Sequence, residues 1–443
     1  MTTKESGTVK APGAIKGIDT TKDSGTLKGA DTMKESGAIK GADTAKDSGT
    51  LKGDDTAKES GAIKDLGAIR EDIDRIDSQI TDLFKARMEK SLEVAKYKQA
   101  HNIPVMNSSR EKEVLVKVSE QIGEPFDGYA RLLFNTIFDA SRSYQNNYLA
   151  RRSDLAERIQ TALESTPKIF PNKAVVACQG VAGSYSQAAC EKLFEVPNIM
   201  YFNSFEGVFN AAEKGLCQYG ILPIENSSYG SVGAVYDLMQ NYNFHIVKSL
   251  RLRINHNLIG KAGTQLSDIK EIYSHEQAIG QCGDFLKSLS GVKITACDNT
   301  AMAAKMVAES DRTDVAAISS KECIDLYGLE LIKKHIQLSD NNYTRFICIS
   351  KKMEIYPGAD KISLILSVPH MPRSLYHTIA KFAALGINLC KLESRPIPGS
   401  DFEFMFYFDL DASVYSPELI NLLSELESQP ETFVFLGCYT EAL

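Results

Sequence analysis

One stretch of this chain, Ala68 to Ala100, contains neither proline nor glycine and repeats apolar residues at helical spacing. Steps of four and three residues keep side chains on one face of a helix. This series is Ile69, Ile73, Ile76, Ile80, Leu83, Arg87, Ser91, Val94 and Lys98. Because burying an unpaired cation costs several kcal/mol, we expect Arg87 and Lys98 to meet an anion on this face.

The length of this helix constrains the fold around it. The sequence Asn102-Ile103-Pro104 ends it, after about 50 Å at about 1.5 Å per residue. Two shorter helices are expected next, from Ser108 or Ser109 to Ile122 and from Asp127 to Leu149. Two short helices cannot cover a helix of this length, so we predict an intertwined dimer of a three-helix unit spanning residues 66–152.

Composition limits the classes of partner. The 443 residues suggest about three domains, and the net charge of −7 without any Lys/Arg-rich run argues against nucleic acid or a membrane surface. The nine cysteines form no Cys-x-x-Cys pair, and no secretory signal precedes them. The histidines show no metal-ligand spacing. A cytoplasmic protein without metal or cofactor is expected.

Residues 1–65 repeat a twelve-residue unit, with copies that begin at Lys22, Lys34, Lys46 and Lys58. Each copy offers one Leu or Ile beside two glycines and four charges, too little apolar surface to offset the entropy of folding. A disordered, low-complexity tail is therefore predicted. An anchoring or docking array is the alternative.

The two shorter helices bring further polar groups to the same apolar faces. They are Arg110, Glu111, Ser141 and Gln145. Arg70 lies next to Ile69, the first residue of the apolar series on the long helix. Four cations, one carboxylate and two neutral hydrogen-bonding groups suit a small multivalent anion. The simpler interpretation is that each cation reaches past the apolar face to water.

With Arg70, Arg87, Lys98, Arg110, Glu111, Ser141 and Gln145 at these spacings, residues 66–150 resemble the all-helical chorismate mutases. The resemblance implies rearrangement of chorismate to prephenate, with Arg70 of the dimer mate and Arg87 holding two carboxylates. Lys98 and Gln145 would address the ether oxygen, Glu111 the substrate hydroxyl, and Arg110 and Ser141 would support them. Asn107 stands where relatives commonly carry Asp, so an amide replaces a carboxylate there.

Residues 171–350 alternate apolar strands with helical stretches, which predicts an α/β domain of two lobes around a cleft. Polar residues follow several strands: Gly183-Ser184-Tyr185-Ser186, Pro223-Ile224-Glu225-Asn226-Ser227, Ser274 with Gln281, and Thr344-Arg345-Phe346. Ligands bind at such strand ends in open α/β sheets. A glycine-rich turn alone is more often a matter of packing.

In this order and spacing the motifs closely resemble prephenate dehydratase, whose fold is a pair of lobes like those of type II periplasmic binding proteins. The resemblance implies loss of carbon dioxide and of the ring hydroxyl from prephenate to give phenylpyruvate. Thr344 matches the residue that assists departure of the hydroxyl. Arg345 would bind a substrate carboxylate, and the further expected contacts are Ser184, Asn226, Ser274 and Gln281.

Residues 360–443 read as strand, helix, strand, strand, helix, strand, the order of the ferredoxin-like α+β unit. The block Glu393-Ser394-Arg395-Pro396 resembles the ACT domain attached to these dehydratases, which implies feedback by L-phenylalanine. Leu375, Asn388, Glu393, Ser394 and Arg395 are the expected effector contacts. Arg373 departs from the family, which usually has glycine there, and a purely structural unit is the alternative.

We therefore expect a bifunctional chorismate mutase/prephenate dehydratase, a homodimer or tetramer, with chorismate and prephenate as substrates and L-phenylalanine as effector. A dehydratase with a degenerate mutase, or a non-catalytic carboxylate or amino-acid sensor, are the alternatives.

Overall fold

The computed structural model describes residues 65–149, 153–397, 399, 403–428 and 432–442. The twelve-residue repeats lie outside this range, so the prediction of a disordered tail falls on residues that are not described. Residues 1–64 are not described. No helix in the described ranges is both long enough and apolar enough to cross a membrane.

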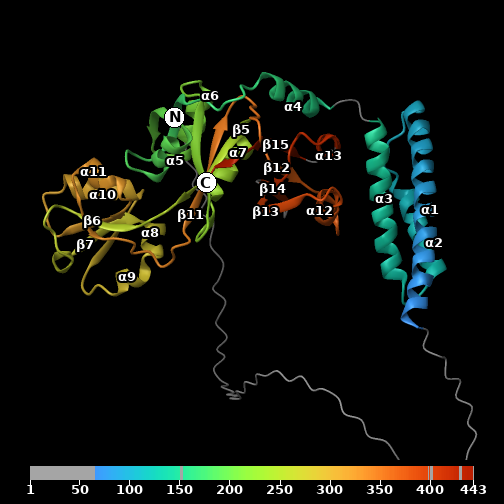
Figure 1. Ribbon diagram of the computed structural model, residues 1–443, viewed down its shortest axis with the longest axis horizontal. Coiled ribbons are helices and arrows are strands. Elements are labelled where there is room, and N and C mark those ends of the chain that lie inside the picture. Colours follow the sequence, from blue (N-terminus) through green and yellow to red (C-terminus); the bar gives the residue numbers. More distant parts are fainter. Residues whose placement is uncertain (1–64, 150–152, 398, 400–402, 429–431, 443) are drawn as a thin grey trace, which may run out of the picture. The chain divides into compact units, whose positions relative to one another are not determined.

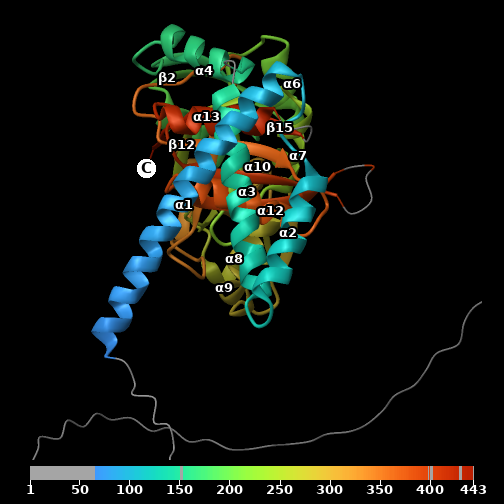
Figure 2. The same cartoon turned by 90° about the vertical axis from the view of Figure 1, so that its right-hand side faces the viewer.

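Three helices form the first region: α1 (Leu66–Ala100), α2 (Ser108–Ile122) and α3 (Asp127–Leu149). They run side by side in both views (Figures 1 and 2). Asn107 begins α2 because its side chain accepts a hydrogen bond from the backbone N–H of Arg110. On α1 the side chains of Ser91 and Ala95 are buried, whereas Leu83, nearer the start of the helix, is 71% exposed.

The first α/β lobe is built on a mixed sheet in the order β16-β5-β11-β3-β1-β2, with β4 paired to β3. Its strands are β1 (Lys173–Gln179), β2 (Val196–Phe202), β3 (Tyr219–Asn226), β4 (Gly230–Ser231), β5 (His245–Arg253), β11 (Tyr343–Ser350) and β16 (Glu441–Ala442). Its helices are α5 (Tyr185–Leu193), α6 (Phe205–Glu213) and α7 (Gly233–Asn241).

The second lobe carries a sheet in the order β10-β6-β9-β7-β8. Its strands are β6 (Asn257–Gly260), β7 (Glu271–His275), β8 (Lys293–Cys297), β9 (Val315–Ser319) and β10 (Glu330–Lys333). Its helices are the 3₁₀ turn η1 (Leu266–Asp268), α8 (Glu276–Gln281), α9 (Gly283–Lys287), α10 (Thr300–Glu309) and α11 (Glu322–Tyr327). The chain crosses between the lobes twice, from β5 to β6 and from β10 to β11.

The third region is a four-stranded antiparallel sheet in the order β13-β14-β12-β15. Its elements are β12 (Lys361–Ser367), α12 (Ser374–Ala384), β13 (Asn388–Pro396), β14 (Phe404–Asp411), α13 (Pro417–Glu427) and β15 (Phe433–Tyr439). This is the predicted β-α-β-β-α-β order. Both helices lie on one face of the sheet (Figure 1).

Helix α4 (Asp154–Ser165) and strand β16 are among the elements that were not predicted. The helix lies between the helical and α/β regions and buries Leu155, Ile159 and Ala162. After the last strand of the third sheet, β16 pairs in parallel with β5 and so extends the sheet of the first lobe. The third region therefore shares a sheet with the α/β region as well as apolar contacts such as those of Tyr407 and Tyr439.

Candidate active sites

A cavity of about 400 Å³ opens between the three helices. Seven residues predicted for the mutase site line it together: Arg87, Lys98, Asn107, Arg110, Glu111, Ser141 and Gln145. The helical periodicity of α1, α2 and α3 brings them to one place, since residues spaced three or four apart share a face. Arg70 is exposed on α1 and does not line this cavity, so its role across a dimer stays a prediction.

Two cations of this cavity, Arg87 and Lys98, donate hydrogen bonds to neutral groups. Arg87 donates to the hydroxyl of Ser141 at 2.5 Å, and its guanidinium lies 5.6 Å from the ring of Phe138. Lys98 donates to the backbone carbonyl of Val105. Burial lowers the pKa of both Arg87 and Lys98, and nearby Glu111 raises it in part. Weakly compensated cations of this kind are suited to receive an anionic ligand.

A residue missed from the sequence, Arg142, also lines the cavity. Its guanidinium pairs with Glu111 and with Asp139, so the carboxylate expected to hold the substrate hydroxyl already has a cationic partner. Arg110 forms an ion pair with Glu113, with 2.9 Å between Nη1 and Oε2. The spacing from Arg142 back to Asp139, one helical turn, was the available signal for this pairing.

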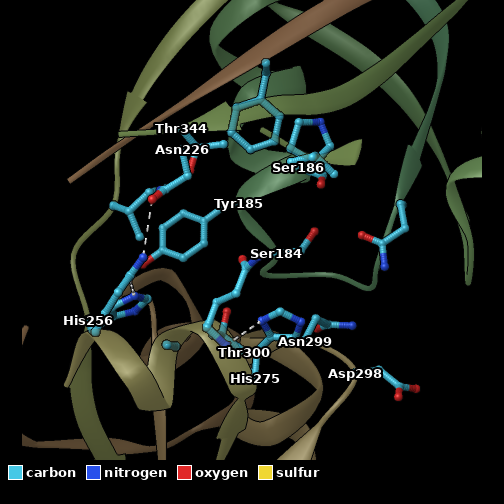
Figure 3. Close-up of a pocket in the computed structure, with 18 of the residues that line it drawn as sticks. Ser184, Tyr185, Ser186, Asn226, His256, His275, Asp298, Asn299, Thr300 and Thr344 are labelled. Carbon is cyan, nitrogen blue, oxygen red and sulfur yellow. Dashed lines mark hydrogen bonds between the residues drawn. The ribbon is translucent and has the colours of Figure 1, made fainter. Parts of the chain in front are cut away.

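A second cavity, of about 390 Å³, lies between the two α/β lobes (Figure 3). Predicted residues Ser184, Asn226, Gln281 and Thr344 line it. Asn226 Nδ2 lies 3.0 Å from Thr344 Oγ1, and Gln281 Nε2 lies 3.4 Å from Asn226 Oδ1. Antiparallel pairing explains the first contact, because Thr344 of β11 stands opposite Asn226 of β3.

Helix starts, rather than cationic side chains, supply positive potential to this cleft. The first residues of α5 and α10 line it, capped by Ser184 and Asn299. Free backbone N–H groups there attract anions. Gly183 is required just before α5, because its φ is +85° and a Cβ would stand 2.8 Å from Cys323 Sγ. Among the described residues, no lysine or arginine lines the cleft.

Arg345, which was predicted to bind a substrate carboxylate, does not line the cleft. Its neighbour Thr344 faces the cleft, and alternate residues of a strand face opposite sides of the sheet. The Arg345 guanidinium is buried against the third region, where it lies 2.7 Å from Glu225 and 2.5 Å from Asp409. Although burial opposes it, the pKa of Arg345 is raised by these carboxylates. The structure thus offers this cation no direct contact with a ligand in the cleft.

Ser274 is also absent from the cleft lining. Its side chain is fully buried and donates to the carbonyl of Ile318 at 2.9 Å. Two residues that were not predicted, His256 in the cleft lining and Asn342 outside it, contact Gln281. No group of three or more His, Cys, Asp or Glu in the described ranges is placed to hold a metal ion.

The residues predicted to bind the effector are divided between several places. Leu375 lines a cavity of about 390 Å³ in front of α12, whereas Asn388, Glu393, Ser394 and Arg395 are not among the described lining residues. Glu393 accepts from Ser231 at 2.7 Å. Arg395 pairs with Asp237 of α7 at 2.7 Å, and Asn388 donates to Asp411.

Arg373, which departs from the family, precedes α12 in a left-handed conformation with φ of +75°. A residue with a Cβ is strained there, and glycine is not.

Two family models match separate regions of this chain. The chorismate mutase type II family model matches residues 69–146, and the prephenate dehydratase model matches residues 176–354. The bifunctional chorismate mutase/prephenate dehydratase of Escherichia coli K12 is 31% identical over 382 residues, which cover 84% of this chain and 95% of that protein.

Two further relatives match a smaller share of the chain. Arogenate dehydratase/prephenate dehydratase 1 of Arabidopsis thaliana is 36% identical over 285 residues, 60% of this chain and 72% of that protein. The solved prephenate dehydratase of Arthrobacter aurescens in complex with L-Phe is 27% identical, with a TM-score of 0.56, and covers 60% of this chain and 90% of that one. Because the match to the two-domain relative includes the helical region as well, this chain belongs to the bifunctional chorismate mutase/prephenate dehydratase family.

Proposed function

We propose that this protein converts chorismate to prephenate in the helical cavity and prephenate to phenylpyruvate in the cleft between the α/β lobes. The observation that carries this is the match to a bifunctional relative across 84% of the chain, with a separate polar cavity in each matched region. The two reactions are successive steps toward L-phenylalanine.

The first reaction needs position and charge rather than a nucleophile. Arg87 would hold a carboxylate of chorismate, and Lys98 with Gln145 would donate toward the ether oxygen as its bond to carbon breaks. Donors preorganised at an atom that gains negative charge lower the barrier. Gln145 is buried, and its Nε2 donates one N–H to the backbone carbonyl of Ser141, which leaves the second N–H for the ether oxygen.

A dimer would complete this site. On α1 the apolar residues Ile73, Ile76 and Ile80 are about half exposed, at 49%, 50% and 54%. An exposed apolar row on a helix of 35 residues favours a second copy of the chain as its partner. Arg70 lies beside this row and would be presented to the cavity of the partner subunit.

In the second reaction, the bond from the ring to its carboxylate breaks and carbon dioxide leaves. Its electron pair enters the ring, the bond from the ring to the hydroxyl breaks, and the hydroxyl departs as water once it has gained a proton. Thr344 would donate a hydrogen bond to this hydroxyl. The substrate carboxylates would meet the starts of α5 and α10.

The cavity in front of α12 is proposed as the site of L-phenylalanine. Leu375, Phe404 and Phe406 line it and would receive the apolar ring. The solved Arthrobacter relative is a complex with this amino acid.

The deciding experiment follows chorismate consumption and phenylpyruvate formation by ultraviolet absorbance, using the purified full-length protein with and without L-phenylalanine. We expect both reactions, with phenylpyruvate formation inhibited by L-phenylalanine. Formation of phenylpyruvate from supplied prephenate but not from chorismate would indicate a degenerate mutase. No change with either substrate would leave a sensor as the remaining interpretation.

Arogenate must be supplied in parallel, because several relatives are named for that substrate. The match of the helical region to a mutase, whose product is prephenate, favours prephenate. Faster turnover of arogenate than of prephenate would contradict this choice.

A further inference from the structure

A row of hydrogen-bonded amide and imidazole side chains connects the hinge between the lobes to Thr344. Figure 3 labels three of its members, His256, Asn226 and Thr344. His256 lies where the chain crosses from β5 to β6, and Asn342 lies just before β11, where it crosses back. Both are almost fully buried, at 3% and 1% exposure. Buried polar groups are costly unless they are hydrogen bonded, so their partners are informative.

The orientation of Asn226 fixes the direction of this row. Asn226 Oδ1 accepts from the backbone N–H groups of Ser228 at 2.9 Å and Tyr229 at 3.0 Å. A backbone N–H can only donate, so this atom must be the oxygen of the amide. Asn226 Nδ2 therefore donates to Asn342 Oδ1 at 2.9 Å and to Thr344 Oγ1 at 3.0 Å.

The same logic extends to the hinge. Since Asn342 Oδ1 accepts, Asn342 Nδ2 donates, and its acceptor is Gln281 Oε1 at 2.8 Å. Gln281 Oε1 also lies 2.6 Å from His256 Nε2. An amide oxygen only accepts, so His256 must carry its proton on Nε2. Burial lowers the pKa of His256, which keeps the ring neutral and Nδ1 without a proton.

We propose that Asn342 and His256 are positioning residues of the dehydratase site, which orient the amides so that Thr344 keeps its hydroxyl proton for the substrate. Thr344 Oγ1 accepts from Asn226, and its proton has no acceptor among the described residues. The proton is thus left for a ligand in the cleft. This inference rests on the proposed dehydratase function and adds the residues that set the direction of donation.

Asn342→Asp tests the inference with almost no change in shape. The new carboxylate oxygen faces Gln281 Oε1 and cannot donate to it, so the hydrogen bonds between His256 and Thr344 can no longer keep their present donors and acceptors. We expect kcat for prephenate to fall by about 10²-fold with KM little changed, because a misdirected donor acts mainly in the transition state. Asn341→Asp, an exposed neighbour with the same change in charge, should match the wild type.

A pair of His256 variants separates a hydrogen-bond role from packing. A glutamine amide can present an N–H near the position of Nε2, whereas the shorter asparagine reaches only the position of Nδ1. We expect His256→Gln to keep most of the kcat and His256→Asn to lose about tenfold. Equal loss in both variants would point to packing alone and overturn the role of Nε2.

Urea unfolding of the same full-length proteins reports whether the α/β lobes are folded, and mutase turnover should stay at the wild-type value. If a variant does not fold, ¹⁵N spectra of histidine-labelled wild type still decide, with His256→Gln used to assign the signal. A neutral ring protonated on Nε2 is expected, and protonation on Nδ1 would overturn the inference. A wild-type protein inactive on prephenate would instead overturn the proposed function itself, whereas full activity of Asn342→Asp would overturn this inference alone.

Discussion

The two cavities would hold the same compound, prephenate, once as product and once as substrate, yet they are built from different chemistry. The helical cavity is lined by Arg87, Lys98, Arg110 and Arg142. The cleft between the lobes is lined by amides, hydroxyls and histidines, without a lysine or arginine among the described residues. A dicarboxylate can thus be met by side-chain cations in one fold and by neutral donors in another.

The architecture explains this difference. Inside a helix every backbone N–H is already bonded, so a cavity between helix sides must recruit charged side chains. In the α/β lobes, α5 and α10 begin at the cleft, and their first N–H groups are free to bind an anion. A site between helix sides can be predicted from charged residues on an apolar face. A site at helix starts is harder to predict, because backbone N–H groups are the same for nearly every residue type.

The strongest test of this comparison is Arg87→Ala. Loss of the cation that is proposed to hold a carboxylate should lower mutase kcat/KM by about 10³-fold, while dehydratase turnover of supplied prephenate stays unchanged. Both rates are measured on the same preparation. Lys85→Ala removes an exposed cation from the same helix and should change neither rate. Equal loss of both activities in Arg87→Ala would contradict the model of separate sites.

Arg345 tests whether the cleft really lacks a cation. Arg345→Met leaves Asp409 and Glu225 without this partner and should destabilise the protein by about 3 kcal/mol, measured by urea unfolding. Arg251→Met removes a half-exposed arginine of the same sheet, paired with Glu441, and should cost less than about 1 kcal/mol. If Arg345→Met kept its stability but raised KM for prephenate, the side chain would be binding substrate after all.

Thr344 tests the neutral chemistry of the cleft. Thr344→Val keeps the shape of the side chain without its hydroxyl, so dehydratase kcat should fall by about 10²-fold. Thr344→Ser restores the hydroxyl and should recover most of the rate. Chorismate turnover serves as the control and should remain at the wild-type value. A fully active valine variant would show that the leaving hydroxyl is assisted by another group.

Alkaline pH should separate the two activities. Burial lowers the pKa of Lys98, and only its protonated form brings a positive charge to the ether oxygen as that atom gains negative charge. Mutase rate should therefore fall as pH rises, beginning below the usual lysine range. The cleft amides do not titrate, and burial lowers the pKa of His256 and His275, which are already neutral in this range. Lys98→Arg should abolish the alkaline fall in whatever mutase activity remains.

The comparison also explains what the sequence could predict. Helical periodicity placed Arg87 and Lys98 on one face of α1, and both line the helical cavity. Strand periodicity places the neighbours Thr344 and Arg345 on opposite faces of the sheet, so the prediction that both contact the substrate was inconsistent with it. Asn342 and His256 carry no charge pattern, and their alignment depends on two chain crossings that only the tertiary fold brings together.

Salt should give the smallest difference between the sites. Screening weakens attraction between separated charges, and the Debye length shrinks from about 10 Å at 0.1 M to about 3 Å at 1 M ionic strength. Raising KCl over this range should increase KM for chorismate by about threefold, because Arg87, Lys98, Arg110 and Arg142 supply the attraction. KM for prephenate in the dehydratase reaction should change less, because helix N–H groups act through hydrogen bonds of about 3 Å between heavy atoms rather than at long range. An equal increase in both values would mean that cations attract the substrate to the cleft as strongly as to the helical cavity.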